Sequence, residues 1–343
     1  MERKPATIAD VARAARVSSA TVSRALRGHS NVSDETRMRI EQVANELNYR
    51  PNASAARLAS KTSAGVALVV PALDSWYFST VMAGVESALS AEGFELFIYV
   101  TGDQQARHRL MSSSLPPGTG GVVLVDVALR RSDIDRLGHR DMPAVSIGLE
   151  FDGMSSVVID DVRVGELATR HLLDLGHRSI ALIGGQPEDP MGFDVSRHRR
   201  SGYLQALAAA GVTPQPDLEV RGDFTVYGGY QAMNQLLDLD PRPTAVFAMS
   251  DEMAFGALRA VRERGLDVPR DLSLIGVDDH PIAWVEDLTT IHQSIRNHGA
   301  TAARLVLELM ASDDPQAQRR IELGTTLVER RSTAPPDPNG APR

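Results

Sequence analysis

The stretch TIADVARAARVSSATVSRAL, residues 7–26, decides the fold at the N-terminal end of the chain. Apolar residues recur in it at the spacing of one helix face: Ile8, Val11, Ala12 and Ala15. Thr7 and Asp10 resemble a capping box, which marks the start of a helix. Arg16 breaks the apolar period, so the pattern predicts a short helix that ends at this residue.

A second and a third helix are predicted from the residues that follow. Ser18 is the predicted N-cap of the second helix. The residues expected to be buried in the second helix are Val22, Ala25 and Leu26. The opposite face of that helix carries small or hydrogen-bonding residues: Ala20, Ser23, Arg24 and Arg27. The third helix is predicted to start at Ser33 and to stop before Pro51. Its expected buried residues are Ile40, Val43, Ala44 and Leu47.

Three short helices with a tight turn between the first two form a helix-turn-helix motif. The thin polar face of the second helix would let its backbone approach the major groove of DNA. Arg24 on that face can donate two hydrogen bonds to a guanine edge. The same periodicity is also typical of a small helical bundle with a solvated polar face.

The charge distribution favours an anion-binding head. The chain has 343 residues and a formal net charge of −8. Residues 1–61 hold 11 basic and 6 acidic residues, a net charge of +5, and the remainder holds 25 and 38, a net charge of −13. A basic end on an acidic body indicates that the head binds nucleic acid while the body has another role.

Composition also bears on the compartment and on the chemistry that is possible. The sequence has no cysteine, which excludes thiol catalysis, disulfides and cysteine-ligated zinc. It contains no apolar run of 18 residues, so we expect no membrane span and no membrane partner. Charged residues interrupt the first 20 positions, so no signal peptide is expected and the protein is predicted to be cytoplasmic.

Residues 7–63 closely resemble the DNA-binding head of the LacI/GalR family of transcription regulators, including the TVSR core and the NYRPN after the third helix. The resemblance continues to about Arg331. It implies base-edge contacts by Ser19, Ala20 and Arg24, and phosphate contacts by Thr21, Ser23 and Asn31. The family commonly has Gly or Asn at the position of Arg16, because that turn needs a positive φ. Arginine there should cost about 1–2 kcal/mol unless the turn changes.

An alanine-rich segment, residues 51–62, follows the head. About eight residues cannot hold a helix alone in water, so the free segment is expected to be a flexible linker. The resemblance implies a hinge helix that orders on operator DNA and pairs with its dimer mate. It also implies that Leu58 inserts between base steps from the minor groove.

From Gly65 onward, short apolar runs alternate with helical segments. The runs are Val66–Val70, Leu96–Val100, Val122–Val125, Ala144–Ile147, Val157–Ile159, Ile180–Ile183, Ala245–Ala248 and Leu272–Val277. Continuous apolar strands between helices indicate parallel sheets covered on both faces, and so many units predict two doubly wound lobes. The resemblance implies a domain like a periplasmic sugar-binding protein, in which the chain crosses between the lobes three times.

The predicted organisation is therefore that of an α/β protein with a small helical head. Its parts are a helix-turn-helix head at 1–50, a hinge at 51–62, an effector-binding domain at 63–331 and a proline-rich, disordered tail at 332–343. Within the effector-binding domain, the N-lobe comprises about 63–160 and 293–320, and the C-lobe comprises about 161–292 and 321–331.

Ligands of doubly wound sheets bind beyond the carboxyl ends of the strands. Carboxylates or aromatic residues follow several predicted strands: Trp76, Tyr77, Phe78, Asp126, Asp160, Asp251, Asp278 and Asp279. Carboxylates accept hydrogen bonds from hydroxyls, and aromatic faces cover a sugar ring or a base. The alternatives are that Asp251 caps the next helix, that Trp76 belongs to the core and that Arg199 is a solvated arginine.

The resemblance also implies a set of effector-binding residues. It places effector contacts at Arg199 and Asp278. Further lining residues would be Tyr77, Phe78, Phe224 and Ser250, with Asp160 and Gln293 as additional candidates. Ser250 departs from the Asn of many sugar-responsive members, which leaves the hydrogen-bond pattern there open.

The sequence thus predicts a homodimeric, ligand-responsive repressor of carbohydrate-utilisation genes. It would bind a palindromic operator on double-stranded DNA and a small sugar-like effector between the lobes, with no cofactor and no metal. The alternatives are a purine- or nucleoside-responsive regulator, a sugar-binding transport protein and a Rossmann-type enzyme. An enzyme is disfavoured because no GxGxxG follows a predicted strand and neither GxSxG nor HExxH occurs.

Overall fold

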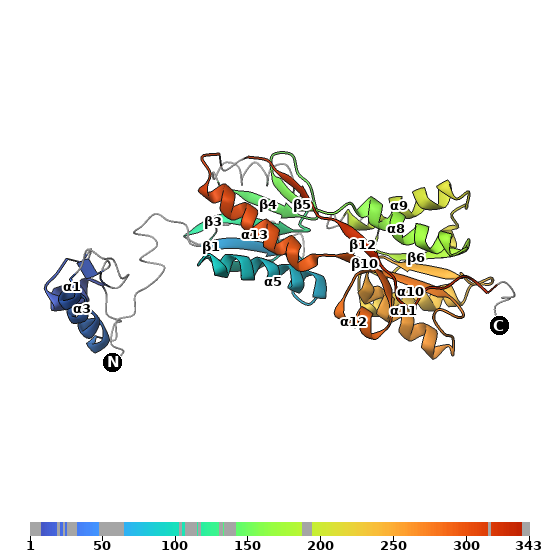
Figure 1. Cartoon of the computed structure of the whole chain (residues 1–343), viewed down its shortest axis with the longest axis horizontal. Coiled ribbons are helices and arrows are strands. Elements are labelled where there is room, and N and C mark those ends of the chain that lie inside the picture. Colours follow the sequence, from blue (N-terminus) through green and yellow to red (C-terminus); the bar gives the residue numbers. More distant parts are fainter. Residues whose placement is uncertain are drawn as a thin grey trace. The chain divides into compact units, whose positions relative to one another are not determined.

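The computed structural model describes residues 8–18, 21–22, 25, 33–47, 65–102, 105–106, 115, 118–129, 133, 142–186, 194–314 and 317–337 (Figure 1). The head and the α/β body are separate units, and each is described by itself. The predicted hinge at 51–62, with Leu58, lies outside the described residues. In the part of the chain that the structure describes, no helix is long and apolar enough to cross a membrane.

The head contains helix α1 (Ile8–Ala15), a helical segment that includes Thr21, Val22 and Ala25, and helix α3 (Asp34–Glu46). Its small core draws on all three: Val11, Ala12, Ala15, Val22, Ala25, Ile40 and Ala44. Leu47 was expected in this core, but it is exposed, at 38%. Since α3 ends at Glu46, Leu47 lies in the following turn and not on the buried face of the helix.

The turn after α1 has the positive φ that was expected at Arg16, with a value of 52°. The backbone N–H of Arg16 donates to the carbonyl of Arg13 (3.3 Å), and that of Val17 donates to the carbonyl of Ala12 (3.0 Å). These two bonds define a Schellman motif, which usually has glycine at its left-handed position. The next helix then begins at Ser18, whose Oγ accepts from the backbone N–H of Thr21 (3.1 Å), as expected of an N-cap.

The N-lobe of the body is built on a six-stranded sheet. Its strands are β1 (Gly65–Val70), β2 (Glu95–Val100), β3 (Thr119–Val125), β4 (Ala144–Ile147), β5 (Ser155–Val158) and β11 (Arg320–Glu322). Their order across the sheet is β11-β5-β4-β3-β1-β2. The central strands β1 and β3 are largely buried, whereas β2 lies at an edge and leaves Ile98 and Val100 exposed.

The C-lobe repeats the same plan. Its strands are β6 (Ile180–Gly184), β7 (Glu219–Arg221), β8 (Ala245–Ala248), β9 (Ser273–Asp278), β10 (Thr289–Gln293) and β12 (Thr325–Val328). Their order is β12-β10-β9-β8-β6-β7, which matches the N-lobe when strands are ranked along the chain. Every strand predicted from an apolar run is present. Four shorter or more polar strands were not predicted: β7, β10, β11 and β12.

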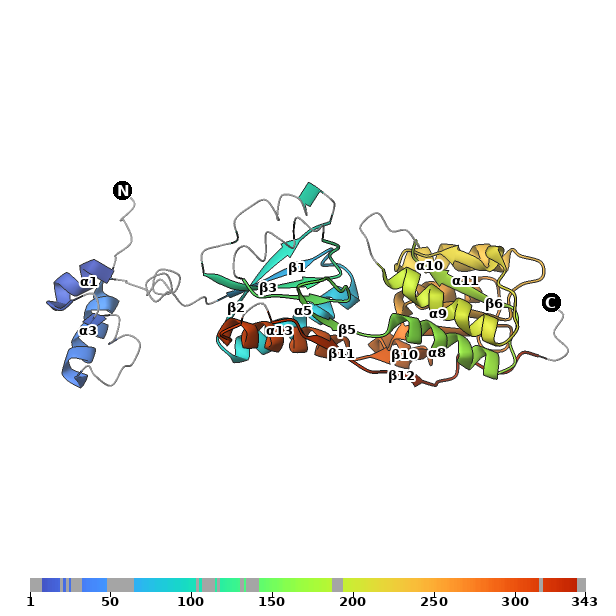
Figure 2. The same cartoon turned by 90° about the horizontal axis from the view of Figure 1, so that it is seen from above.

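Helices pack in pairs on these sheets. They are α5 (Trp76–Ala91) with α13 (Ile295–Ala311), α8 (Asp161–Asp174) with α9 (Val195–Ala209), and α10 (Val226–Leu237) with α11 (Asp251–Glu263). Figure 2 shows α8 and α9 side by side on the C-lobe. A short 3-10 helix (Pro216–Leu218) precedes β7, and a short α12 (Pro281–Val285) follows β9.

Each helix pair meets at glycines that let two backbones touch. A Cβ atom added at Gly84 of α5 would lie 2.0 Å from the carbonyl oxygen of Arg296 in α13. One added at Gly299 of α13 would lie 2.0 Å from the carbonyl oxygen of Val81 in α5. The same reciprocal contact recurs in the C-lobe, at Gly165 and Gly202 between α8 and α9 and at Gly229 and Gly256 between α10 and α11. Any larger residue would push the paired helices apart.

The chain crosses between the lobes three times. β5 leads to α8 through residues 159–160, β10 leads to α13 through Ser294, and β11 leads to β12 through residues 323–324. The last crossing therefore lies a few residues later than the predicted boundary after residue 320. β11 is parallel to β5, whereas β12 is antiparallel to β10, because one segment passes straight from the first sheet into the second.

The predicted disordered tail, residues 332–343, is wrong at its start. Ser332 is buried, and its carbonyl accepts from the backbone N–H of Leu274 (2.8 Å). Its Oγ accepts from the backbone N–H of Thr289 (2.7 Å). A small hydroxyl residue can thus bind to the ends of two buried strands, which the proline content of the tail did not indicate. Residues 338–343 lie outside the described part of the chain.

Candidate functional site

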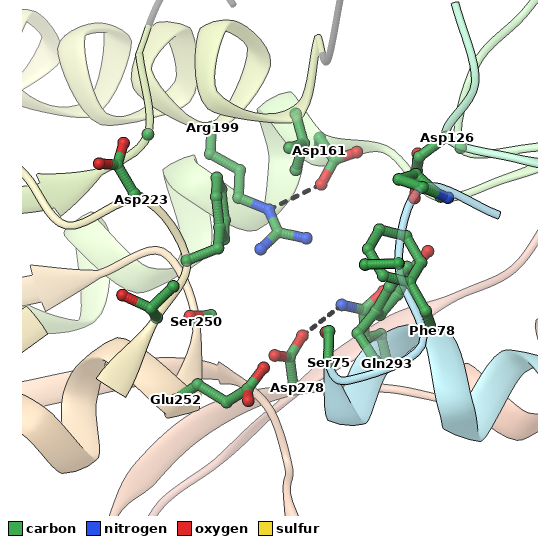
Figure 3. A pocket seen from close by; sticks show the side chains of 18 of the residues that line it. Ser75, Phe78, Asp126, Asp161, Arg199, Asp223, Ser250, Glu252, Asp278 and Gln293 are labelled. Carbon is green, nitrogen blue, oxygen red and sulfur yellow. Dashed lines mark hydrogen bonds and ion pairs between the residues drawn. The ribbon is translucent and has the colours of Figure 1, made fainter. Parts of the chain in front are cut away.

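A pocket of about 560 Å³ lies between the two lobes. On the N-lobe side, its walls are the segments that follow β1, β3 and β4. On the C-lobe side, they are the segments that follow β6, β7, β8 and β9. Figure 3 shows side chains of both lobes pointing into this space. The carboxyl ends of both sheets therefore converge on one pocket, the place where doubly wound folds bind their ligands.

The structure brings together most of the effector-binding residues that were predicted. Those that line the pocket are Tyr77, Phe78, Arg199, Phe224, Ser250, Asp278 and Gln293. They come from both lobes and from segments far apart in the sequence. Their position fits the prediction, and the role of each in binding an effector remains a prediction.

Asp160 does not line the pocket, which corrects the prediction for this residue. It is the N-cap of α8, and its carboxylate accepts from the backbone N–H of Arg163 (2.9 Å). The neighbouring Asp161 lines the pocket instead. Two successive aspartates follow β5, and the start of the helix turns the first toward its own backbone and the second toward the pocket.

Arg199 is held in the pocket wall by partners on two sides. Its side chain is only 6% exposed. Nε donates to Asp161 (2.8 Å), and Nη1 donates to the backbone carbonyl of Met249 (2.5 Å). Burial would lower the pKa of Arg199, but the nearby carboxylates of Asp161 and Asp278 raise it, so the guanidinium stays charged. The alternative interpretation, a solvated arginine, is therefore wrong.

Asp278 ends β9 and lies across the pocket from this guanidinium (Figure 3). Its Oδ1 accepts from Nε2 of Gln293 (2.5 Å), which ends the neighbouring strand β10. Burial raises the pKa of Asp278 to about 7, while Arg199 and Gln293 act in the opposite direction. Near neutral pH this carboxyl can therefore either donate or accept a hydrogen bond.

Asp126 supplies a carboxylate from the N-lobe. It follows β3 and has a positive φ of 47°. Burial and the nearby carboxylate of Asp161 raise the pKa of Asp126 to about 7, although a hydrogen bond from the Tyr77 hydroxyl lowers it. Asp126 follows a predicted strand but was not among the predicted effector-binding residues, although the rule that points to Asp278 applies to it equally.

Aromatic rings form the apolar part of the pocket. The rings of Tyr77 and Phe78 meet edge to face, with centroids 5.3 Å apart, at the start of α5. Phe224, in the loop after β7, lines the same pocket. Trp76, in contrast, packs against the N-lobe core, and its ring contacts that of His280 in the C-lobe at 4.2 Å. The core interpretation of Trp76 is thus correct, with the addition that it bridges the lobes.

Glu252 links the two lobes beside the pocket. It belongs to α11 of the C-lobe, and it accepts hydrogen bonds from the hydroxyl of Ser75 and the backbone N–H of Trp76 in the N-lobe. Ser75 is the N-cap of α5, but its side chain makes no capping bond. A carboxylate from the other lobe therefore caps α5. No local sequence pattern could have shown this, because the two partners belong to different lobes.

Asp251, the neighbouring residue, was predicted to cap α11, and this prediction is wrong. Ser250 is the cap, since its Oγ accepts from the backbone N–H of Met253 (3.3 Å). Asp251 is fully buried and accepts from the hydroxyl of Thr290 (2.7 Å) and the backbone N–H of His280 (2.8 Å). It ties α11 to the segments that leave β9 and enter β10.

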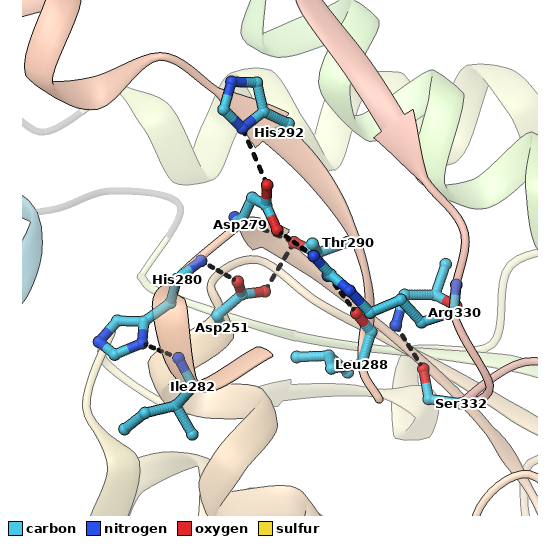
Figure 4. A network of polar contacts seen from close by, with 10 residues as sticks. Asp251, Asp279, His280, Ile282, Leu288, Thr290, His292, Arg330 and Ser332 are labelled. Carbon is cyan, nitrogen blue, oxygen red and sulfur yellow. Dashed lines mark hydrogen bonds and ion pairs between the residues drawn. The ribbon is translucent and has the colours of Figure 1, made fainter. Parts of the chain in front are cut away.

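Asp279 extends this connection beside the pocket (Figure 4). Its carboxylate accepts from Arg330 (2.6 Å) and contacts Nδ1 of His292 (3.1 Å). Arg330 also donates to the backbone carbonyl of Leu288 (2.8 Å). The network therefore fixes the end of β9 to the strands at the edge of the C-lobe, and it holds Asp278 in place.

His298 is a further pocket residue that was not predicted from the sequence. It lies on α13, is 2% exposed, and its Nε2 has no hydrogen-bond partner among the described residues. Burial lowers its pKa to about 4, so the imidazole is neutral at physiological pH. A histidine on the otherwise apolar face of a helix was the available signal.

Most of the DNA-contacting residues that were predicted lie outside the described residues. These are Ser19, Ala20, Ser23, Arg24, Asn31 and, in the hinge, Leu58. Thr21 is described and lies in the first turn after the N-cap Ser18, with 2.8 Å between the two hydroxyl oxygens. The start of a helix is a suitable place for a phosphate contact, and that role of Thr21 remains a prediction.

Comparisons with known proteins agree with both parts of the chain. The family model for bacterial regulatory proteins of the lacI family matches residues 7–52, and that for a periplasmic binding protein-like domain matches residues 169–333. The HTH-type transcriptional repressor PurR of Erwinia tasmaniensis is 35% identical over 336 residues, which cover 96% of this chain and 97% of that repressor.

Two solved structures are similar over nearly the whole length. The lac repressor dimer bound to operator and the anti-inducer ONPF has a TM-score of 0.83 at 30% identity, covering 96% of this chain and 100% of that one. The complex of the transcriptional regulator CelR with cellobiose has a TM-score of 0.70 at 32% identity, covering 95% and 99%. The chain therefore belongs to the LacI family of bacterial DNA-binding transcription regulators.

Proposed function

We propose that this protein is a homodimeric repressor that binds a palindromic operator and responds to a small polyhydroxylated effector in the pocket. The convergence of Arg199 and Asp278 beside the rings of Tyr77 and Phe78 carries this proposal. A guanidinium only donates and an ionised carboxylate only accepts, whereas a hydroxyl does both. The aromatic faces would cover the apolar side of a sugar ring. The similarity to a regulator bound to cellobiose supports a carbohydrate effector.

Exposed apolar residues on the C-lobe support the homodimer. They lie at the start of α10 and in α12: Val226, Tyr227, Ile282, Trp284 and Val285. Trp284 is 75% exposed and Tyr227 is 68% exposed. Three of these side chains lie in the five-residue helix α12, and such a cluster of exposed large apolar residues is typical of a protein interface. Trp284→Glu should therefore produce monomers in analytical ultracentrifugation, and a dimer unchanged by it would place the interface elsewhere.

A purine or nucleoside is the second candidate effector. The 35% identity to PurR favours it, as does the presence of Phe78 and Phe224 in one pocket, because aromatic rings stack on bases. Carboxylates such as Asp278 also accept from ring N–H groups. The two candidates can be distinguished because a nucleoside would gain affinity from contacts of its base, whereas a sugar has no base.

We further propose that the pocket binds its ligand without catalysing a reaction of it. Two carboxyl groups with raised pKa values, Asp126 and Asp278, could in principle act as general acids. The similarity to repressors over nearly the whole chain favours binding instead. Incubation with nitrophenyl glycosides should release no nitrophenol, and steady release that is lost in Asp278→Asn would contradict this view.

The effector can be identified by its effect on both ligand sites. A thermal-shift screen of the full-length protein over a sugar panel and a nucleoside panel should show one class that raises the melting temperature. The same compound should change operator affinity in fluorescence anisotropy. Arg199→Ala and Asp278→Ala should leave operator binding in place and remove the response, at a loss of about 2–5 kcal/mol in effector binding.

Operator recognition is tested separately. Arg24→Ala should cost roughly 1–3 kcal/mol at one base pair in each half-site, because it removes a base-edge contact. Thr21→Ala should weaken binding to all sequences alike. If Arg24→Ala lowers affinity equally for operator and for random DNA, Arg24 does not read a base. Footprinting should show a pseudo-palindrome whose half-sites lie about one helical turn apart.

A further inference from the structure

The pocket carries an excess of acidic groups. The described residues that line it include six carboxylates and two arginines. They are Asp74, Asp126, Asp161, Asp223, Glu252 and Asp278, with Arg199 and Arg221. Each arginine already pairs with a lining carboxylate, Arg199 with Asp161 at 2.8 Å and Arg221 with Asp223. Four carboxylates are left that form no salt bridge with any described residue.

These carboxylates act on one another through the pocket. Burial and the charge of Asp161 raise the pKa of Asp126 to about 7. Burial raises the pKa of Asp278 to about 7 as well, with Glu252 and Asp161 adding to the effect and Arg199 and Gln293 opposing it. Near neutral pH, protons therefore balance part of the negative charge in the pocket.

This charge selects among ligand classes. A phosphorylated or carboxylated ligand would be repelled by the carboxylates and would find both arginines already paired. A neutral hydroxyl can donate to one carboxylate but leaves the charge unchanged. An ammonium group donates three hydrogen bonds and cancels one negative charge, and hydrogen bonds between charged groups are the stronger kind.

His298 gives an independent indication of a polar ligand. Its imidazole is 2% exposed and lines the pocket, and its Nε2 lacks a hydrogen-bond partner among the described residues. Burial lowers its pKa to about 4, and Arg199 and His292 add to this effect, so the ring is neutral and contributes no positive charge to the pocket. An unpartnered buried nitrogen is costly, and a polar ligand group that reaches it would remove that cost.

Among the described residues, Asp126 is the one lining carboxylate of the N-lobe that is neither in a salt bridge nor exposed to solvent. Glu252 accepts from Ser75 and Trp76, and Asp278 accepts from Gln293. Asp74 is exposed to solvent. Among the described residues, only the hydroxyl of Tyr77 donates a hydrogen bond to the side chain of Asp126.

We propose that the effector of this pocket carries an amino group, as an amino sugar or an aminated polyol does, and that Asp126 accepts its ammonium. This rests on the proposed function, because it assumes that the pocket is the effector site. The ring hydroxyls of such a ligand would meet Arg199 and Asp278. The ammonium would lie toward the N-lobe, beside Asp126 and Tyr77.

The test is calorimetry of the full-length protein with sugars that differ at one position. D-glucosamine, D-glucose and N-acetyl-D-glucosamine form one such set, and the galacto and manno series provide two more. In one series at least, the ammonium member should bind 10-fold or more tighter than its hydroxyl and acetamido partners. Its binding heat at pH 7 should also vary with the ionisation enthalpy of the buffer, because the ammonium displaces protons from the carboxyls.

Asp126→Asn tests the residue assignment. Asparagine has the same shape and tolerates the positive φ of this position, so the variant should fold. It should lose the 10-fold preference for the ammonium member while retaining affinity for the hydroxyl member. Asp152→Asn, an exposed substitution in a turn of the same lobe, is the matched control and should retain the preference.

The proposal is wrong if the hydroxyl members bind as tightly as the ammonium members, or if no ammonium member of the three series binds. It is also wrong for Asp126 if Asp126→Asn keeps the preference. Failure of the proposed function would look different. An amino sugar would then bind in the pocket with the expected preference, but operator affinity in anisotropy would not change.

Discussion

The N-lobe and the C-lobe place six strands in the same order, yet they present different chemistry to the pocket between them. The C-lobe contributes the buried Arg199–Asp161 pair and Asp278. The N-lobe contributes the rings of Tyr77 and Phe78 and the half-buried carboxyl of Asp126. The shared scaffold sets where a ligand binds, and the segments after its strands set which ligand binds. The two lobes can therefore be altered separately, with distinct expected effects.

The largest effect is expected in the C-lobe, from Arg199→Ala. The substitution leaves Asp161 and the carbonyl of Met249 without their buried partner, which should destabilise the protein by about 3–5 kcal/mol. Urea denaturation of the full-length protein measures this loss. Arg197→Ala is the control on the same helix, because its pair with Asp194 is exposed and should contribute less than about 1 kcal/mol. Equal losses in the two variants would mean that burial gives the Arg199 pair no special weight.

The next effect should be the same in both lobes. Gly202→Ala in the C-lobe and Gly299→Ala in the N-lobe would each place a Cβ about 2 Å from a carbonyl oxygen. Each should destabilise the protein by about 1–3 kcal/mol, because the helix pairs must separate. Gly324→Ala has no heavy atom within 4 Å of the added Cβ and serves as the control in calorimetric melting. A large loss in one lobe only would show that the lobes differ in rigidity as well as in chemistry.

The N-lobe carboxyl should give a pH dependence of its own. The pKa of Asp126 is raised to about 7 in the folded protein. The contribution of its protonated form to the free energy of unfolding is therefore fully present below the ordinary aspartate pKa and is lost as pH rises through about 7. Relative to Asp126→Asn, the wild type should lose up to about 1.4 kcal/mol of unfolding free energy per pH unit between pH 5 and 7. Denaturation of both proteins across that range measures the difference, and the titration of the histidines cancels in it. Parallel profiles would mean that Asp126 is ionised throughout.

The smallest effect is expected in the head, with the melting transition of the body as the reference. Arg16→Gly should stabilise the head by about 1 kcal/mol, because glycine adopts the φ of 52° without strain. Calorimetry of the full chain should show a change confined to the transition of the head. Arg16→Asn should fall between arginine and glycine. A shift in the transition of the body would show that the head does not unfold separately.

Much of this fold could be predicted from the sequence, because a buried parallel strand needs a continuous apolar run. The strands that were missed lack one. β10 reads TTIHQ, and its threonines are buried because Asp251 and Ser332 bind them. These partners lie far away in the sequence. The same limit explains the tail, where Ser332 enters the C-lobe through hydrogen bonds that no local pattern encodes.

The position of the pocket could be predicted from the sequence more reliably than the contacts that its residues make. The rule that ligands lie beyond strand ends located Asp278, and it applies equally to Asp126. It could not decide between Asp160 and Asp161, because that choice depends on which residue begins the helix. Nor could it reveal the contact of Glu252 with Ser75, which forms only when the two lobes are placed together.

The three crossings between the lobes have a consequence for the order in which the protein is completed during synthesis. The N-lobe begins with β1, but it still lacks α13 and β11 when every C-lobe strand except β12 has left the ribosome. Until then, Gly84 of α5 has no α13 backbone to pack against, and the edge of β5 has no partner strand. The C-lobe can therefore bury most of its core before the N-lobe, which starts earlier, receives α13 and β11. A nascent chain released before residue 320 would expose apolar surface on the N-lobe, which was synthesised first, and chaperones and proteases would bind there.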